Sequence, residues 1–170
     1  ALTYSWFMEA RTLHAPLDTL SAANRPQGIE IATLTTFDIP ALAVLTLEAY
    51  DDAVTPEALL ETSEELRLTF EGAFGATTED SFVGAWDGGT LIGAILVVRE
   101  SPWDDAPDGP FVVDLIVAPD YRRRGIATAL VSEVATRCTN WGFDTLALRL
   151  DSRHGGAREL YSMLGFEEIA

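Results

Sequence analysis

Lysine is absent from this chain of 170 residues, in which all eleven basic residues are arginine. The chain therefore has no lysine that could serve a P-loop, which disfavours one large class of phosphate-binding α/β domains. Cysteine is limited to Cys138, so no intramolecular disulfide can form, and a reducing compartment such as the cytoplasm is expected. No apolar run approaches the roughly 20 residues that span a bilayer, and no signal peptide is recognised at the start.

Positive charge is scarce, and the formal net charge is -16 at pH 7. The imbalance lies in residues 1–110, which contain 4 Arg against 19 Asp and Glu, whereas residues 111–170 contain 7 Arg against 8. Such an acidic protein repels nucleic acid and anionic membranes and attracts cations. The simpler explanation of this negative charge is a solvated acidic surface that serves only solubility.

The hydrophobic pattern predicts one mixed α/β domain over residues 29–170, preceded by an N-terminal strand and linker extension over residues 1–28. Asp87-Gly88-Gly89 is typical of a hairpin turn, and Asp38 is expected to cap a helix. The strands are expected at residues 29–34, 81–86, 90–98, 111–117, 145–150 and 166–169, and the helices at 38–50, 55–74, 125–138 and 157–164. This order predicts a central, partly antiparallel sheet flanked by helices.

An anion site is predicted where the apolar strand at residues 111–117 ends. Three consecutive arginines, Arg122 to Arg124, precede Gly125 and a helical pattern that continues to about Cys138. The first turn of a helix presents unpaired N–H groups and the positive end of the helix dipole. A phosphate or pyrophosphate is the natural ligand of such a turn.

Three blocks of residues resemble the GCN5-related N-acetyltransferase (GNAT) superfamily over roughly residues 29–170. Asp114-Leu115-Ile116-Val117-Ala118-Pro119 and Arg122-Arg123-Arg124-Gly125-Ile126-Ala127 look like the family's strand and acetyl-CoA signature. Ala157-x-x-Leu160-Tyr161-x-x-Leu164-Gly165-Phe166 resembles a later motif. The residues Asp114-Leu115 and the sequence from Arg122 to Leu130 resemble motifs of the aminoglycoside 3-N-acetyltransferase branch.

The resemblance implies acetyl-CoA as co-substrate and no metal. The pyrophosphate would lie on the N–H groups of residues 122–127, and the pantetheine arm would pair with the strand ending at Val117, as an added strand does. The cofactor-binding residues implied in this way are Leu115, Ile116, Val117, Arg122, Arg123, Arg124, Gly125, Ile126, Ala127, Thr128 and His154.

The resemblance also implies two catalytic groups. Tyr161 occupies the place of the family's frequent general acid, which would protonate the departing thiolate; a core tyrosine on an apolar helix face is the alternative. Asp114 lies in an apolar strand, where a carboxylate is costly unless it has a partner. It is either the general base or half of a structural ion pair, and Glu100 and Asp105 are weaker candidates for the base.

The chain departs from the family pattern at two places. His154 stands where many members have asparagine. The chain also stops soon after Gly165-Phe166, where members usually carry a seventh strand, while residues 2–13 have the alternation of a terminal strand. We therefore expect this N-terminal segment to supply the missing strand, in its own subunit or in the partner subunit of a homodimer.

Together these features predict an N-acetyltransferase that moves an acetyl group to a primary amine by direct attack. The acceptor would be a cationic small molecule or peptide, because the acidic segments Glu48–Asp52 and Asp104–Asp108 would flank it. Neither nucleic acid nor a membrane is expected as a partner. The alternative is a non-catalytic CoA-binding sensor or interaction module with the same fold.

Overall fold

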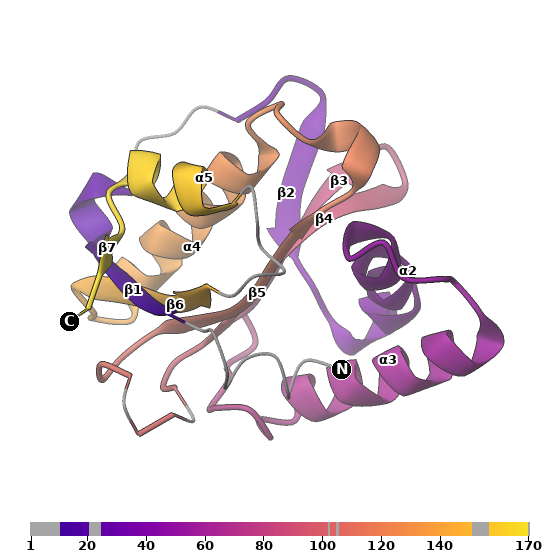
Figure 1. The fold of residues 1–170 in the computed structure, drawn as a ribbon, viewed down its shortest axis with the longest axis horizontal. Helices are drawn as coiled ribbons and strands as arrows, with labels where there is room; N and C mark the ends of the chain where they lie inside the picture. Colours follow the sequence, from indigo (N-terminus) through magenta and orange to yellow (C-terminus); the bar gives the residue numbers. More distant parts are fainter. Residues whose placement is uncertain (1–10, 21–24, 102, 105, 151–156, 170) are drawn as a thin grey trace.

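A single seven-stranded sheet organises the chain (Figure 1). The computed structural model describes residues 11–20, 25–101, 103–104, 106–150 and 157–169. The sheet order is β2-β3-β4-β5-β6-β1-β7, and every neighbouring pair is antiparallel except β5 and β6. The strands are β1 (Arg11–Pro16), β2 (Ile29–Thr33), β3 (Phe82–Asp87), β4 (Thr90–Val98), β5 (Phe111–Val117), β6 (Thr145–Leu150) and β7 (Glu167–Glu168).

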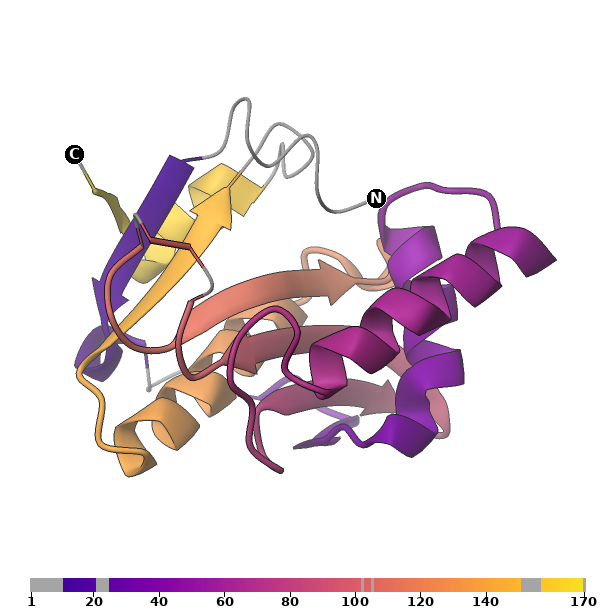
Figure 2. The same cartoon turned by 90° about the horizontal axis from the view of Figure 1, so that it is seen from below.

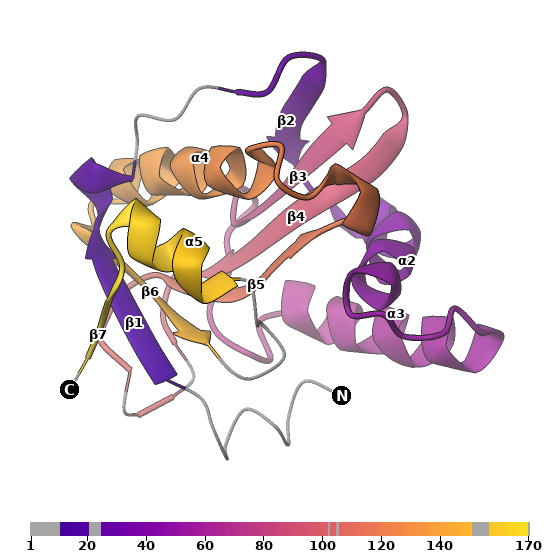
Figure 3. The ribbon, with the colours of Figure 1, turned by 45° about the horizontal axis from the view of Figure 1, so that its top comes forward.

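Helices cover both faces of this sheet (Figure 3). On one face α2 packs on β4 and β5, and α3 packs on α2. On the other face α4 crosses β3 to β6, and α5 lies beside it over the β6 and β1 half of the sheet. The helices are α2 (Ile39–Ala49), α3 (Pro56–Phe70), α4 (Ile126–Asn140) and α5 (Ala157–Leu164). The predicted mixed α/β architecture is therefore confirmed.

Strand β5 is buried on both faces, as its nearly continuous apolar sequence predicts. Val112 belongs to the core beneath α4, and Ile116 belongs to the core beneath α2 and α3. Gly93 in the neighbouring β4 lets α4 approach closely, because a Cβ at that position would stand 3.0 Å from Cγ2 of Ile126. The start of α4 is thereby held against the middle of the sheet.

The first two helices of the chain begin in different ways. The Thr55 hydroxyl accepts a hydrogen bond from the Ala58 N–H at 3.1 Å and so caps α3, just before Pro56. The expected side-chain cap of α2 by Asp38 is wrong. The Asp38 carboxylate instead accepts the N–H of Thr35 at 2.8 Å, closing the 3₁₀ turn Thr36–Asp38 that leads into α2.

The N-terminal strand lies inside the sheet, between β6 and β7. Leu13 pairs with Leu148 on one side and with Glu168 on the other, so β1 joins the strand that follows Phe166 within the same chain. An N-terminal strand therefore pairs with the sheet there, as expected, but β1 runs over Arg11–Pro16 and so continues three residues past the predicted end at residue 13. The earlier part of the predicted strand, residues 2–10, lies outside the described residues.

Cys138 lies on the buried face of α4 and is the only cysteine of the chain. Burial, together with the charge of Asp80, raises the pKa of its thiol to about 12. At pH 8 only about one thiol in 10,000 is then a reactive thiolate. We expect a thiol reagent to label no cysteine in the folded protein and one in denaturant. Fast labelling of the folded chain would contradict the burial of this side chain.

Candidate active site

The predicted anion site is a loop of alternating backbone conformation between β5 and α4. A 3₁₀ turn, Pro119–Tyr121, follows β5, and the next residues include Arg123 with φ 63° and Gly125 with φ 81°. The first helical hydrogen bond of α4 runs from the Ala129 N–H to the Gly125 carbonyl at 3.0 Å. The N–H groups of the preceding turn have no helical acceptor, so this turn, the cradle, has the free donors that an anion site needs.

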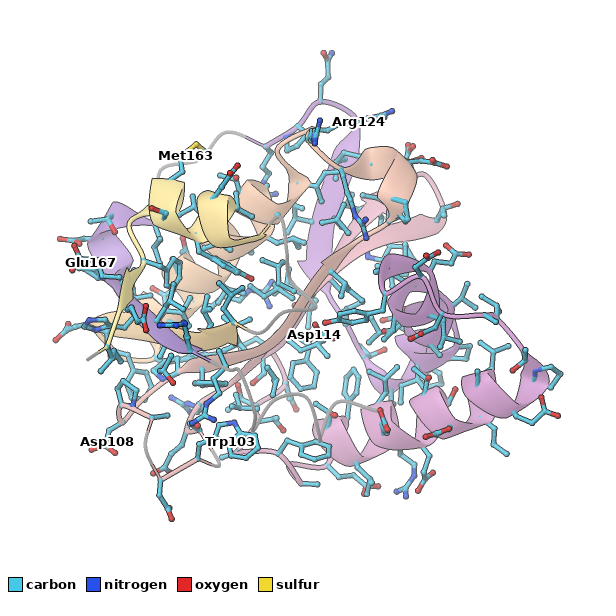
Figure 4. The ribbon with its side chains drawn as sticks, viewed as in Figure 1. Trp103, Asp108, Asp114, Arg124, Met163 and Glu167 are labelled. Carbon is cyan, nitrogen blue, oxygen red and sulfur yellow. The ribbon has the colours of Figure 1, made fainter. Side chains whose placement is uncertain are left out.

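The three arginines of the loop point to different places. Arg122 donates from its Nη2 to the carbonyl oxygen of Ala49 at 2.7 Å and from its Nε to that of Val117 at 3.2 Å. The guanidinium of Arg124 lies over the ring of Tyr121, 5.1 Å from its centroid, at the loop (Figure 4). Arg123 is exposed. The side chain of Arg122 thus faces the end of α2.

Tyr121 ties this loop to the hairpin between β3 and β4. Its hydroxyl donates to the Asp87 carboxylate at 2.6 Å, and this hydrogen bond raises the pKa of the tyrosine. The loop is therefore attached to three elements: the β3–β4 hairpin by Tyr121, α2 by Arg122, and the sheet by β5. These contacts connect the loop to the rest of the fold.

Strands β5 and β6 pair over two residues each and then diverge (Figure 2). They pair only at Phe111 with Ala147 and at Val112 with Leu148. A register shift in the pairing with β4 places Leu96 opposite Asp114 and Val97 opposite Val112, so Val113 forms a bulge. In the described part of the chain no strand pairs with β5 beyond Val112 on its β6 side, which leaves an open edge that ends at the cradle.

Asp114 directly follows the bulge. It lies near the centre of the molecule, between the side formed by α4 and α5 and the side formed by α2 and α3 (Figure 4). Its side chain is 6% exposed, and its Oδ1 accepts the Tyr50 hydroxyl at 2.5 Å. Tyr50 is the residue at the C-terminal end of α2. The sequence placed the segment Glu48–Asp52 beside the acceptor but did not predict the contact of Tyr50 with Asp114, because no spacing rule connects two residues that are 64 positions apart.

Tyr161 on α5 packs in the core beneath α4, edge-on to Phe166 with ring centroids 5.4 Å apart. Burial raises the pKa of its phenol well above the usual value, and the negative charge of Asp114 raises it further. The phenol therefore stays protonated at neutral pH. The two residues that the sequence marks as catalytic thus interact electrostatically across the diverging strands.

The remaining predicted site residues fall into three groups. Leu115 and Val117 pack against the α4 core and Ile116 against the α2 core, while their backbone forms the open edge of β5. Ile126 is buried at the start of α4, and Ala127 and Thr128 beside it are half-buried.

Two predicted site residues lie outside the described residues. They are His154, the predicted CoA ligand, and Asp105, one of the two weaker candidates for the general base. The other weaker candidate, Glu100, is exposed.

The acidic loop between β4 and β5 carries an aromatic contact that the sequence did not predict. Trp103 packs against the small core of Val98, Phe111 and Ala147. The Arg149 guanidinium lies over its ring, 4.9 Å from the centroid. Asp104 and Asp108 in this loop are exposed, and Figure 4 shows Asp108 at the edge of the molecule, away from Asp114.

Neither a metal centre nor a membrane span is found in the described ranges. No group of three or more His, Cys, Asp or Glu side chains there could hold a metal ion. No helix among these residues is long and apolar enough to cross a bilayer.

The sequence model of the acetyltransferase (GNAT) family matches residues 45–166, more than half of the chain. The chain belongs to the GNAT family. The predicted superfamily and its enzyme class, the acetyltransferases, are thereby confirmed. The match covers β3 to β6, the cradle and α5, and it leaves β1 and β2 outside. No match was found among curated protein sequences.

Solved structures share the fold of this GNAT chain. A GCN5-related N-acetyltransferase from Sphaerobacter thermophilus superposes with a TM-score of 0.66 at 23% identity, over 95% of this chain and 48% of that one. A protein of Pyrococcus horikoshii OT3 gives 0.70 at 17% identity, over 84% and 90%. The aminoglycoside acetyltransferase AAC(6')-Iy, in complex with a CoA-containing bisubstrate analogue, gives 0.62 at 20%, over 84% and 92%.

Some of these structures are much longer than this chain. It spans about half of the Sphaerobacter protein and 57% of a protein of unknown function from Staphylococcus epidermidis. At these identities the similarity establishes the fold, and the substrates of the GNAT chain are a separate question.

Proposed function

We propose that this chain transfers an acetyl group from acetyl-CoA to a primary amine of a cationic acceptor. The observation that carries the proposal is the buried Tyr161, whose phenol is kept protonated partly by the charge of Asp114. A proton donor on α5 and a carboxylate on β5 thus influence each other electrostatically, and β5 leads into the loop with the proposed anion site. Acyl transfer from a thioester to an amine needs both a proton donor and a proton acceptor.

The cradle and the open edge of β5 support acetyl-CoA as the donor. The Arg122 N–H donates to the Pro119 carbonyl at 3.4 Å, so the N–H groups of residues 123–128, and not of 122–127 as expected, would bind the pyrophosphate. Backbone groups of Leu115 to Val117 would pair with the pantetheine amides. His154 and the exposed Arg123 and Arg124 stay proposed contacts. Two solved relatives of the fold, both AAC(6')-Iy, are in complex with CoA or a CoA-containing analogue.

The proposed chemistry balances over three groups. Asp114 accepts a proton from the ammonium form of the acceptor, because only the neutral amine has a lone pair for attack. The amine nitrogen then bonds to the thioester carbonyl carbon, and the C–S bond breaks. Tyr161 gives its proton to the departing thiolate, the attacking nitrogen gives its second proton to the tyrosinate, and Asp114 releases its proton to solvent. Tyr50 orients the Asp114 carboxylate through its hydrogen bond of 2.5 Å.

A cationic acceptor is supported by the charge of the chain. Residues 1–110 contribute most of the net charge, and they include Tyr50 with the adjacent Asp51 and Asp52. A negative field of this kind raises the local concentration of cations and speeds their encounter. Aminoglycosides, polyamines and peptide N-termini all have this chemistry. A reducing compartment such as the cytoplasm suits the single thiol of Cys138.

An acetylation screen over amine classes tests the proposal. We expect CoA release with at least one class of cationic amine, and we expect Asp114→Asn to lower kcat/KM for that amine by about 100-fold. Asp108→Asn, which removes an exposed carboxylate at the edge of the molecule, is the matched control and should leave turnover unchanged. CoA binding without turnover across the whole panel would instead indicate a non-catalytic CoA-binding module.

A further inference from the structure

The end of α2 lacks a cation of its own. No basic residue lies in its last turn, although a positive charge there stabilises the negative end of a helix dipole. The carbonyls of Leu47 and Glu48 accept hydrogen bonds from the N–H groups of Asp52 and Asp51. The next carbonyl, that of Ala49, accepts the guanidinium of Arg122. A residue of the cradle thus supplies the cation that α2 lacks.

Two contacts connect the same end of α2 to the site. Arg122 binds the Ala49 carbonyl at 2.7 Å, and the next residue, Tyr50, donates to Asp114 at 2.5 Å. The second donor of Arg122 reaches the Val117 carbonyl, at the end of the strand that carries Asp114. The cradle, α2 and β5 are therefore connected to one another in a ring. Arg122 joins the cradle to α2 and to β5, and the hydrogen bond from Tyr50 to Asp114 joins α2 to β5.

We propose that Arg122 is a positioning residue that couples occupation of the cradle to the order of the acceptor side of the site. This inference rests on the proposed function, because it takes the cradle to bind CoA. A pyrophosphate on the N–H groups of residues 123–128 restricts the loop and, with it, the backbone of Arg122. The exposed Arg122 side chain then loses less freedom when it binds Ala49, so the end of α2 and Tyr50 become more ordered.

Amide hydrogen exchange can measure this coupling with CoA alone, in the absence of an amine substrate. The N–H groups of Tyr50, Asp51 and Asp52 donate to the last carbonyls of α2, so their exchange reports the opening of this helix end. In the unaltered protein we expect saturating CoA to slow exchange at these amides by about fivefold. In Arg122→Ala we expect the CoA-dependent slowing to disappear, while the CoA affinity changes by less than about threefold.

Two further variants separate coupling from a general loss of structure. Arg122→Lys can still donate to one carbonyl and should restore part of the slowing. Arg25→Ala removes another exposed arginine, one that binds Glu133 on α4 at 3.1 Å, and should keep the slowing in full. A merely structural role for Arg122 would make α2 exchange faster with and without CoA alike and would leave the CoA-dependent difference intact.

The outcomes of this experiment test the coupling through Arg122 and the proposed function separately. An unchanged CoA-dependent difference in Arg122→Ala would overturn the coupling and leave the proposed function in place. A loss of CoA affinity of 30-fold or more in that variant would show that the side chain is itself a phosphate ligand, and this too would overturn the coupling. Failure of the unaltered chain to bind CoA would overturn the proposed function, and the coupling with it.

Discussion

Replacement of Tyr161 by phenylalanine will lower kcat by about 100-fold or more, because it removes the proton donor for the departing thiolate. The substitution deletes one oxygen atom from a side chain that packs edge-on against Phe166, so the ring can stay in the core. CoA affinity should therefore change little. Steady-state kinetics with an acceptor from the screen, together with CoA titration by calorimetry, will measure both effects.

The pH dependence sharpens the test of Tyr161. Its pKa is raised by burial and by Asp114, so the phenol stays protonated throughout the range from pH 7 to pH 9. The ratio of kcat between the unaltered chain and Tyr161→Phe should hence be constant over this range. A ratio that falls as the pH rises would mean that another group titrates as the acid. A change in kcat below about threefold would leave Tyr161 with a packing role only.

Replacement of Gly125 by valine will weaken CoA binding by about 30-fold or more, because the charge-assisted bonds from the start of α4 depend on its backbone. Gly125 has φ 81°, in the left-handed region that valine strongly disfavours. A Cβ there would have room, since its nearest neighbour would be Cγ of Pro26 at 4.0 Å. The effect should thus arise from backbone conformation at the cradle.

The other end of the same helix provides a matched control. Gly142 follows α4 with φ 95°, and a Cβ there would meet nothing within 4 Å. Gly142→Val should cost about as much stability as Gly125→Val, roughly 1–2 kcal/mol, because both force a left-handed conformation on a branched residue. Only Gly125→Val should lose CoA affinity. An equal loss in both variants would assign the effect to stability and would remove the cradle from CoA binding.

Local patterns in the sequence predicted most of the fold. The alternation of β3 and β4 around Asp87-Gly88-Gly89 and the apolar run of β5 produced the expected strands, because burial of one or both faces dictates these patterns. The cradle was predicted for the same reason: its glycine, arginines and helix start are adjacent in sequence. The cap of α2 was mispredicted, since Asp38 had two competing backbone donors and bound the one at Thr35.

Contacts across the sheet could not be predicted in this way. Arg122 was expected to face a phosphate, as a basic residue beside a helix start usually does, but its guanidinium reaches the end of a helix 73 positions earlier. The segment Glu48–Asp52 was expected to flank the acceptor, but a contact of Tyr50 with Asp114 was not expected. Each contact depends on how α2 crosses β5. That crossing is determined by the packing of many apolar side chains, and the sequence does not show which apolar side chain packs against which.

The sequence by itself determined the family, the order of strands and helices, the turn proposed to bind an anion, and the two residues proposed as acid and base. These features depend on neighbours along the chain, where periodicity and backbone conformation act. Only the tertiary structure decided that Tyr161 and Asp114 interact, that Tyr50 binds Asp114, and that Arg122 binds α2. Those pairs arise where β5 leaves β6 and packs under α2, because hydrogen bonds and charges act through space between segments that hydrophobic packing has brought together.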